Sequence, residues 1–196
     1  MNFKPGDLFF GLMEFLAYIV PGFIFCVTLP LFFNCRIDDF CDLKNNQTST
    51  FGWVSLTLVS YIVGHFIHHL SAIILNPLYT VTYLKWRRKK HEYFITEMEK
   101  QINEKISISS GGPLEKAEAY IKVNNPTLIP ELEKYQANSK LFRSLSLLCI
   151  YLCFIPNINW WARMLLIPIS YLSYHKFANQ RWNHRALIYQ YFNLIN

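Results

Sequence analysis

An uncharged, mostly apolar run extends from Phe51 to Leu84, and a cluster of basic residues closes it. A helix needs roughly 20 apolar residues to cross the hydrocarbon core of a bilayer. Basic residues beside such a helix normally stay on the cytoplasmic side. The pattern therefore predicts a membrane-spanning helix that ends at a basic cytosolic collar. The collar consists of Lys85, Arg87, Arg88, Lys89 and Lys90.

An earlier apolar run, Leu8 to Phe33, predicts another span. It contains Pro21 and Pro30, which predict a kink or a break in the helix. Glu14 is the only acidic residue inside any apolar run. An intramembrane carboxylate is a functional candidate by default. Because Glu14 lies close to the start of the span, a carboxylate that reaches interfacial water is the alternative.

Two shorter apolar runs follow near the end of the chain, Ser144–Pro156 and Trp160–Tyr174. Both are short for a full crossing. We expect a tight transmembrane hairpin that locally thins the bilayer, with a re-entrant hairpin as the alternative. Arg143 and Arg163 stand near the ends of this hairpin, and we expect them to snorkel toward opposite membrane faces.

Charge sets the direction of the predicted spans. Residues 85–143 hold 12 Lys and Arg against 8 Glu, whereas the loop at 34–50 has two cations against three acids. Cationic loops remain in the cytoplasm, so the first segment is expected inside and the loop outside. Four spans then place both termini in the cytoplasm. Within the inner segment, the spacing of apolar residues predicts helices at 85–106, at 113–123, and from Pro130 into the third span.

The sequence thus predicts an all-α, polytopic membrane protein with four transmembrane helices and a helical cytosolic insertion. Residues 1–84 form two N-terminal transmembrane helices with a short outer loop at 34–50. Residues 85–143 form the basic helical insertion, and 144–174 the short transmembrane hairpin. Residues 175–196 form an amphipathic cytosolic tail helix, which lies on the membrane surface or packs on the insertion.

Composition agrees with this class of protein. Hydrophobic residues occupy 52% of the 196 positions and charged residues only 16%, whereas a soluble domain has about 25% charged residues. The net charge is +6 and the pI is near 9.0. We interpret the excess of Lys and Arg as orienting charge that contacts anionic lipid. Direct binding of nucleic acid is the less favoured interpretation.

The second span carries a stripe of polar side chains on one helix face, at about 100° per residue. Ser60 and Gly64 form a pair of small residues on an adjoining face, where helix backbones can approach closely. We interpret the stripe as a helix-packing surface that faces a neighbouring subunit or a pore. The alternative is a metal or proton-relay site in which a third ligand such as Glu14 joins His65 and His69, which are four residues apart. The stripe consists of Tyr61, His65, His68, His69 and Asn76.

Cys35 and Cys41 lie in the predicted outer loop. In an oxidising compartment they could form a disulfide, and otherwise they remain two thiols. The sequence contains no GxSxG, Walker A, GxGxxG or HExxH motif. We therefore expect a non-enzymatic protein without a cofactor.

The layout resembles a family of small multi-spanning accessory proteins encoded beside type VI-B CRISPR RNA-guided nucleases, and other short membrane proteins of bacterial anti-phage systems. The resemblance rests on the chain's size, its four predicted spans, the stretch Lys85–Lys90, and the segment Phe142-Arg143-Ser144-Leu145 that leads into the third span. It implies an accessory or effector protein of the bacterial inner membrane. Such a protein would form a homo-oligomer and modulate anti-phage defence or membrane integrity through a cytosolic protein or ribonucleoprotein partner.

Two other functions are compatible with the sequence. A small channel or transporter component could use Glu14, His65 and His69 as a proton or ion path. It would respond to pH near the titration range of histidine. A membrane enzyme could instead act on a lipid-linked substrate, and it would turn over substrate without a partner.

Overall fold

The computed structural model describes residues 5–32, 50–106, 111–156 and 158–195, and it leaves the side chains of residues 5–14, 31, 32, 50 and 51 undescribed. All regular structure in these ranges is helical, which confirms the all-α prediction. The longer helices are α1 (Pro5–Phe32), α3 (Thr50–Tyr79), α7 (Ile129–Cys153) and α8 (Trp160–Ile195). The shorter ones are η1 (Thr80–Leu84), α4 (Lys85–Lys90), α5 (Glu92–Lys105), α6 (Pro113–Asn124) and η2 (Pro126–Leu128).

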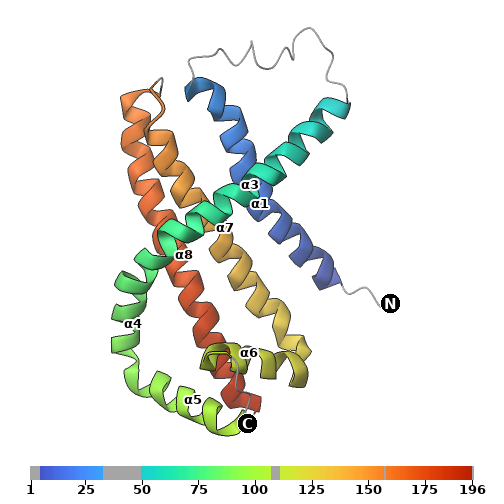
Figure 1. Ribbon diagram of the computed structural model, residues 1–196, viewed down its shortest axis with the longest axis vertical. Coiled ribbons are helices and arrows are strands. Elements are labelled where there is room, and N and C mark those ends of the chain that lie inside the picture. Colours follow the sequence, from blue (N-terminus) through green and yellow to red (C-terminus); the bar gives the residue numbers. More distant parts are fainter. Residues whose placement is uncertain (1–4, 33–49, 107–110, 157, 196) are drawn as a thin grey trace.

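The two N-terminal helices cross each other as an X (Figure 1). α1 runs through Pro21 and Pro30 without a break in its helical assignment. At the crossing, Gly22 of α1 lies against the backbone of Ser60, and Gly64 of α3 lies against the backbone of Tyr18. A side chain on either glycine would overlap the opposite carbonyl oxygen. The two glycines therefore permit direct backbone contact, which small residues provide in packed helices.

α3 continues through η1 and α4 as one helical stretch that changes its hydrogen-bond pattern after Pro77. Proline lacks a backbone N–H and disrupts the regular helical ladder, and a π-helical turn, Thr80–Leu84, follows it. Thr80 donates to the carbonyl of Asn76 at 2.9 Å, and Thr82 donates to that of Leu78 at 2.6 Å. These side-chain bonds supply donors where the ladder is irregular. The irregularity that follows Pro77 is thus a local π segment.

Helices α4, α5 and α6, the first half of α7 and the last part of α8 form one end of the molecule, which we call the cap (Figure 1). The helix predicted over 85–106 is interrupted at His91, which separates α4 from α5, so that prediction was wrong at one residue. The helix predicted at 113–123 is confirmed as α6. The cap has a conventional apolar core, made of Ile95, Met98, Ile102, Ile106, Ala117, Ile121, Leu132, Ile188, Tyr189 and Phe192.

α7 and α8 run from the cap to the other end of the molecule (Figure 1). The tail predicted at 175–196 is the continuous extension of α8 rather than a separate helix. Its residues Ile188, Tyr189 and Phe192 belong to the cap core, so it packs on the inserted helices. At the far end, Arg163 donates to the carbonyls of Ile155 and Pro156 at 2.8 and 2.7 Å. These carbonyls belong to the turn after α7, where Ile158 N–H also donates to the Ile155 carbonyl at 3.3 Å, so Arg163 ties the start of α8 to that turn.

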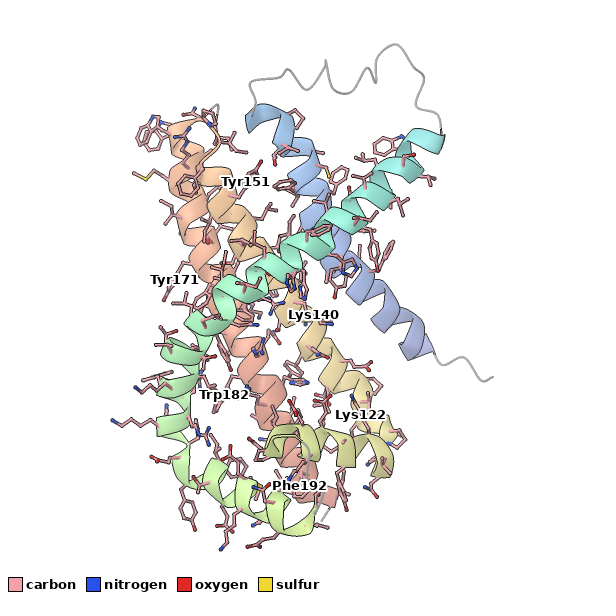
Figure 2. The ribbon with its side chains drawn as sticks, in the orientation of Figure 1. Lys122, Lys140, Tyr151, Tyr171, Trp182 and Phe192 are labelled. Carbon is pink, nitrogen blue, oxygen red and sulfur yellow. The ribbon has the colours of Figure 1, made fainter. Side chains whose placement is uncertain are left out.

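The other end of the molecule, which we call the apolar-faced half, contains α1, α3, α7 from Ser144 and α8 up to Tyr174. In its described part, apolar and polar side chains are distributed differently from those of the cap. Large apolar side chains project outward, as Tyr171 does in Figure 2. Small polar residues lie inside, because Ser60, Ser71, Ser144, Ser146 and Ser170 are all buried. The outward residues include Val54, Leu58, Phe66, Ile73, Trp161, Leu165 and Leu172, each at least half exposed.

Serine pairing explains how α7 and α8 approach within this half. Ser146 Oγ donates to the carbonyl of Ser170 at 3.1 Å, and Ser170 Oγ donates to that of Ser146 at 3.0 Å.

In the parts of the chain that the structure describes, one helical stretch, Gly52–Lys90, is long and apolar enough to cross a membrane. The apolar helix Phe15–Pro30 is shorter.

Candidate functional site

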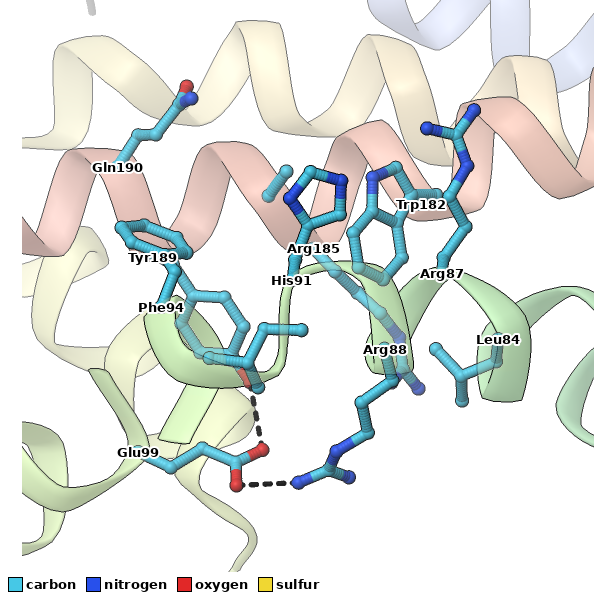
Figure 3. Close-up of a pocket in the computed structure, with 12 residues that line it drawn as sticks. Leu84, Arg87, Arg88, His91, Phe94, Glu99, Trp182, Arg185, Tyr189 and Gln190 are labelled. Atoms are coloured by element: carbon cyan, nitrogen blue, oxygen red, sulfur yellow. Dashed lines mark hydrogen bonds and ion pairs between the residues drawn. The ribbon is translucent and has the colours of Figure 1, made fainter. Parts of the chain in front are cut away.

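A cleft of about 430 Å³ opens in the cap between α4–α5 and the second half of α8 (Figure 3). This volume lies within the range of roughly 300–1,000 Å³ found for small-molecule sites. Its position follows from the break at His91, which turns α5 away from α4 and leaves space beside α8. One wall is lined by Leu84, Arg87, Arg88, His91, Phe94, Ile95 and Glu99, and the other by Trp182, Arg185, Ala186, Tyr189 and Gln190.

Glu99 ties three helices together at the base of the cleft. Arg88 Nη2 lies 2.7 Å from one carboxylate oxygen, and Tyr189 donates to the other at 3.4 Å (Figure 3). Burial, followed by the charge of Glu99, raises the pKa of Tyr189 to about 12. Tyr189 therefore remains a hydrogen-bond donor at neutral pH. A partly exposed ion pair contributes about 0–1 kcal/mol, so these contacts fix geometry more than they stabilise the fold.

The cleft carries an excess of positive charge. Arg87, Arg88 and Arg185 face a single carboxylate, Glu99, so three cations and one anion leave a formal charge of +2. Arg87 is held by the Tyr83 hydroxyl, at 3.0 Å from Nη2, and lies over the rings of Tyr83 and Trp86. Arg185 has no hydrogen-bond or ion-pair partner among the described residues. It is the cleft cation whose donors remain available to a ligand.

Aromatic rings form much of the remaining surface. The ring of His91 lies 5.7 Å from that of Trp182, and the two planes are inclined by 34°. Phe94 and Tyr189 add two further rings on opposite walls. Aromatic faces bind planar groups by stacking, and guanidinium groups bind phosphate through paired N–H donors. The cleft therefore combines donors for an oxyanion with surfaces for a planar ring.

The collar predicted from the sequence contributes only two of its five residues to this site. Arg87 and Arg88 line the cleft, while Lys85, Lys89 and Lys90 are exposed outside it. Sequence reasoning missed the α8 wall, which lies about a hundred positions further along the chain. A signal was present: Trp182, Arg185 and Tyr189 are three and four residues apart and so share one helix face.

The polar stripe of α3 is used by neighbouring helices of the same chain. The ring of His65 stacks on that of Tyr18 from α1 at 3.9 Å, and Tyr61 and His68 contact the same tyrosine. Asn76 binds arginines of α7 and α8. His69 is exposed. The stripe thus divides between the α1 contact, the α7–α8 contact and the surface.

Arg143 behaves differently from its prediction. It is 5% exposed and binds His68 and Asn76, so it does not snorkel toward a membrane face. The described residues contain no group of three His, Cys, Asp or Glu that could hold a metal ion. The Glu14 side chain, Cys35 and Cys41 lie outside the described part of the chain, and their predicted roles stay predictions.

Comparison with protein-family models, with curated proteins and with solved structures finds no match to this chain. The site must therefore be interpreted from its own geometry.

Proposed function

We propose that this chain is a non-enzymatic, multi-pass membrane protein that binds a phosphate-bearing, ring-containing ligand, such as a nucleotide, at its cytosolic face. The observation that supports the membrane location is that the two ends of the molecule differ in where their apolar and polar side chains lie. Exposed apolar side chains cover the outside of α1, α3 and α8 at one end, Ile150 of α7 adds to them, and five serines are buried inside. Exposed apolar surface of this extent marks a membrane or protein interface in a folded protein, and small polar interiors are typical of packed transmembrane helices.

The arrangement of the chain supports four crossings. The end of α1, the start of α3 and the connection between α7 and α8 lie at the same end of the molecule, opposite the cap (Figure 1). Among residues 15–30, 52–84, 144–156 and 160–174, the only Asp, Glu, Lys or Arg is Arg163. Of the 12 cations of residues 85–143, Arg143 lies at the boundary and the others belong to the opposite end. The cap then faces the cytoplasm, in agreement with the preference of basic segments.

The ligand site is connected to the membrane helices through continuous backbone. α3 reaches the cleft through η1 and α4, and α8 reaches it directly. A ligand bound between Arg87 and Arg185 would contact both connections at once. We infer that occupancy of the cleft changes how α3 and α8 are held relative to each other. A ligand-dependent change in the position of two membrane helices is what a regulated accessory or effector protein requires.

The membrane arrangement is tested by labelling single cysteines with a membrane-impermeant maleimide. Asn159→Cys and Lys89→Cys would each be made in a chain whose five native cysteines are replaced by serine. We expect Asn159→Cys to be labelled in intact spheroplasts and Lys89→Cys only after permeabilisation. Labelling of both from one side, or release of the protein by alkaline carbonate, would contradict the four-span arrangement.

Ligand binding is tested by thermal shift of the purified, detergent-solubilised protein with AMP and with ribose 5-phosphate, which lacks the base. We expect AMP to raise the Tm with saturation and ribose 5-phosphate to bind at least tenfold more weakly. Arg185→Gln should weaken AMP about tenfold, equivalent to about 1.4 kcal/mol, because it removes the unpaired cation. Lys89→Gln removes the same charge from the collar outside the cleft and should change little. Equal effects of the two variants would reject the cleft as the site.

The proposal includes a role in phage defence, a homo-oligomeric state and a cytosolic protein or ribonucleoprotein partner, all of which rest on the resemblance of the layout alone. Native mass spectrometry in mild detergent measures the number of subunits directly, and a monomer would contradict the proposed homo-oligomer. Co-expression with a type VI-B nuclease should lower phage plaque counts relative to the nuclease alone. Unchanged counts would remove the defence role and leave the ligand site untouched.

A channel or transporter is the second candidate, because a chain of contacting polar groups runs within the apolar-faced half from His65 through Tyr18 and His68 to Arg143. Such a path predicts proton or ion flux in liposomes that depends on pH in the ordinary titration range of histidine. Flux that is absent, or that His65→Leu leaves unaltered, would remove this candidate.

A further inference from the structure

Two arginines from different helices meet on one neutral amide where α3, α7 and α8 come together. Arg143 Nη1 donates to Asn76 Oδ1 at 2.9 Å, and Arg181 Nη1 donates to the same oxygen at 3.0 Å. Arg143 is 5% exposed, and Arg181 is partly buried. We call this group the arginine node. It lies at the boundary between the apolar-faced half and the cap, and its residues are separate from those that line the cleft.

The contacts that the structure gives these two arginines are all neutral. Arg143 Nη2 lies 2.9 Å from His68 Nε2, and because a guanidinium can only donate, that nitrogen must carry a lone pair. Arg143 also lies over the ring of Phe177, at 5.9 Å, and Arg181 over that of Tyr79, at 5.6 Å. No described carboxylate forms an ion pair with either arginine.

Donors outnumber acceptors at the node. Arg143 Nε and the Tyr79 hydroxyl are buried and have no hydrogen-bond partner among the described residues. Both belong to the cluster around Phe177, whose ring contacts Tyr79 and lies beneath Arg143. Burial, followed by the charge of Arg185, lowers the pKa of Arg181. A buried cation is costly unless it is paired and its donors are satisfied. Among the side chains that the structure describes, the node therefore holds two guanidinium groups and no acceptor that carries negative charge.

We propose that the arginine node binds a phosphate group through the N–H groups of Arg181 that do not bind Asn76, beside the buried guanidinium of Arg143. A tetrahedral oxyanion accepts several hydrogen bonds and neutralises both guanidinium groups, which pair well with phosphate. The phosphate has two sources of the same chemistry, a phospholipid headgroup of the inner leaflet or free phosphate. The lipid source rests on the proposed membrane location, whereas the free source does not.

The first arm uses thermal unfolding of the lipid-depleted protein in detergent, with sodium phosphate titrated at constant ionic strength. We expect a saturable rise in Tm for the unchanged protein. Arg181→Gln should weaken the apparent affinity at least tenfold, and Arg181→Lys should lose less because it keeps the charge. Lys176→Gln, an exposed cation of the same helix, is the matched control and should behave like the unchanged protein.

The second arm counts bound phospholipid by native mass spectrometry after reconstitution with phosphatidylglycerol. Retention of lipid by the unchanged protein, lost in Arg181→Gln and kept in Lys176→Gln, assigns the site to a headgroup. Dependence on sodium phosphate alone assigns it to the free ion, whatever the location of the protein. If neither probe separates Arg181→Gln from Lys176→Gln, the proposal is overturned.

Glu14 is the competing source of negative charge, and a variant tests it directly. If the Glu14 carboxylate neutralised the node, Glu14→Gln would acquire a phosphate dependence that the unchanged protein lacks. That result would also overturn the proposal. A Glu14→Gln chain whose phosphate response matches that of the unchanged protein supports it. Arg185→Gln, which affects the cleft, should retain the response to phosphate while it weakens AMP, so the two sites remain distinguishable.

Discussion

His184 shows how a single partly buried side chain makes the stability of the cap depend on pH. It lies on α8, facing Glu118 and Lys122 of α6, with Arg181 and Arg185 on its own helix. Burial lowers the pKa of His184 from its ordinary value. The Glu118 carboxylate opposes this shift, and the three cations reinforce it. The folded protein therefore holds this proton less tightly than the unfolded chain does.

The direction of the pH effect follows from linkage. Above the ordinary histidine pKa of about 6.5, His184 is neutral in both states and has no effect. As the pH falls below that value, the unfolded chain takes up the proton first, so the protein loses stability until the lower pKa of the folded state is passed. We expect the Tm to fall as the pH drops below about 6.5. His184→Asn should flatten that fall, while His175→Asn, an exposed histidine, should not. Identical curves for both variants would contradict this assignment.

At the scale of elements, the crossing of α1 and α3 depends on two glycines in mutual backbone contact. A Cβ on Gly22 would overlap the Ser60 carbonyl oxygen and lie 2.8 Å from the backbone nitrogen of Gly64. A Cβ on Gly64 would overlap the Tyr18 carbonyl oxygen. Because backbone atoms cannot rotate away, the helices must separate. Gly22→Ala or Gly64→Ala should destabilise the protein by about 1–3 kcal/mol, measured by denaturation in detergent.

Two further variants make the crossing experiment specific. A Cβ on Gly112 would have no atom within 4 Å of it, so Gly112→Ala should be tolerated. The double variant Gly22→Ala with Gly64→Ala should cost less than the sum of the single changes, because both act by separating the same two helices. Full additivity would indicate that the two glycines act at independent contacts.

Sequence patterns predicted the elements better than their partners. The lack of charge from Phe51 to Leu84 was sufficient to place α3, and Pro113 and Pro130 marked the starts of helices in the cap. The break at His91 had no signal, because Lys85–Ile106 contains no proline or glycine. The cleft was equally hidden, because its α8 wall is formed by residues far along the chain. The pair Ser60–Gly64 did predict a close helix contact, but not that Gly22 would supply the opposite face.

At the scale of the whole molecule, α8 joins two environments with opposite packing rules. Ser170 pairs with Ser146 in the apolar-faced half, whereas Phe177, Ile188 and Phe192 are buried at the boundary and in the cap. These contacts require one fixed rotation of the helix along its whole length. The same rotation places Arg181 at the node and Arg185 in the cleft. Register along α8 is therefore the common condition for both proposed sites.

A one-residue insertion tests this dependence on register. An alanine placed between Ser173 and Tyr174 turns everything after it by about 100°. Phe177 then leaves its contacts with Tyr79, and Arg181 and Arg185 turn away from Asn76 and the cleft. We expect the AMP and phosphate responses to be lost together, with a lower Tm. An alanine inserted after Asn125, in the link before η2, lengthens the chain equally without rotating α8, and it should preserve both responses. If the insertion in α8 also preserved them, the sites would not depend on the rotation that α8 imposes.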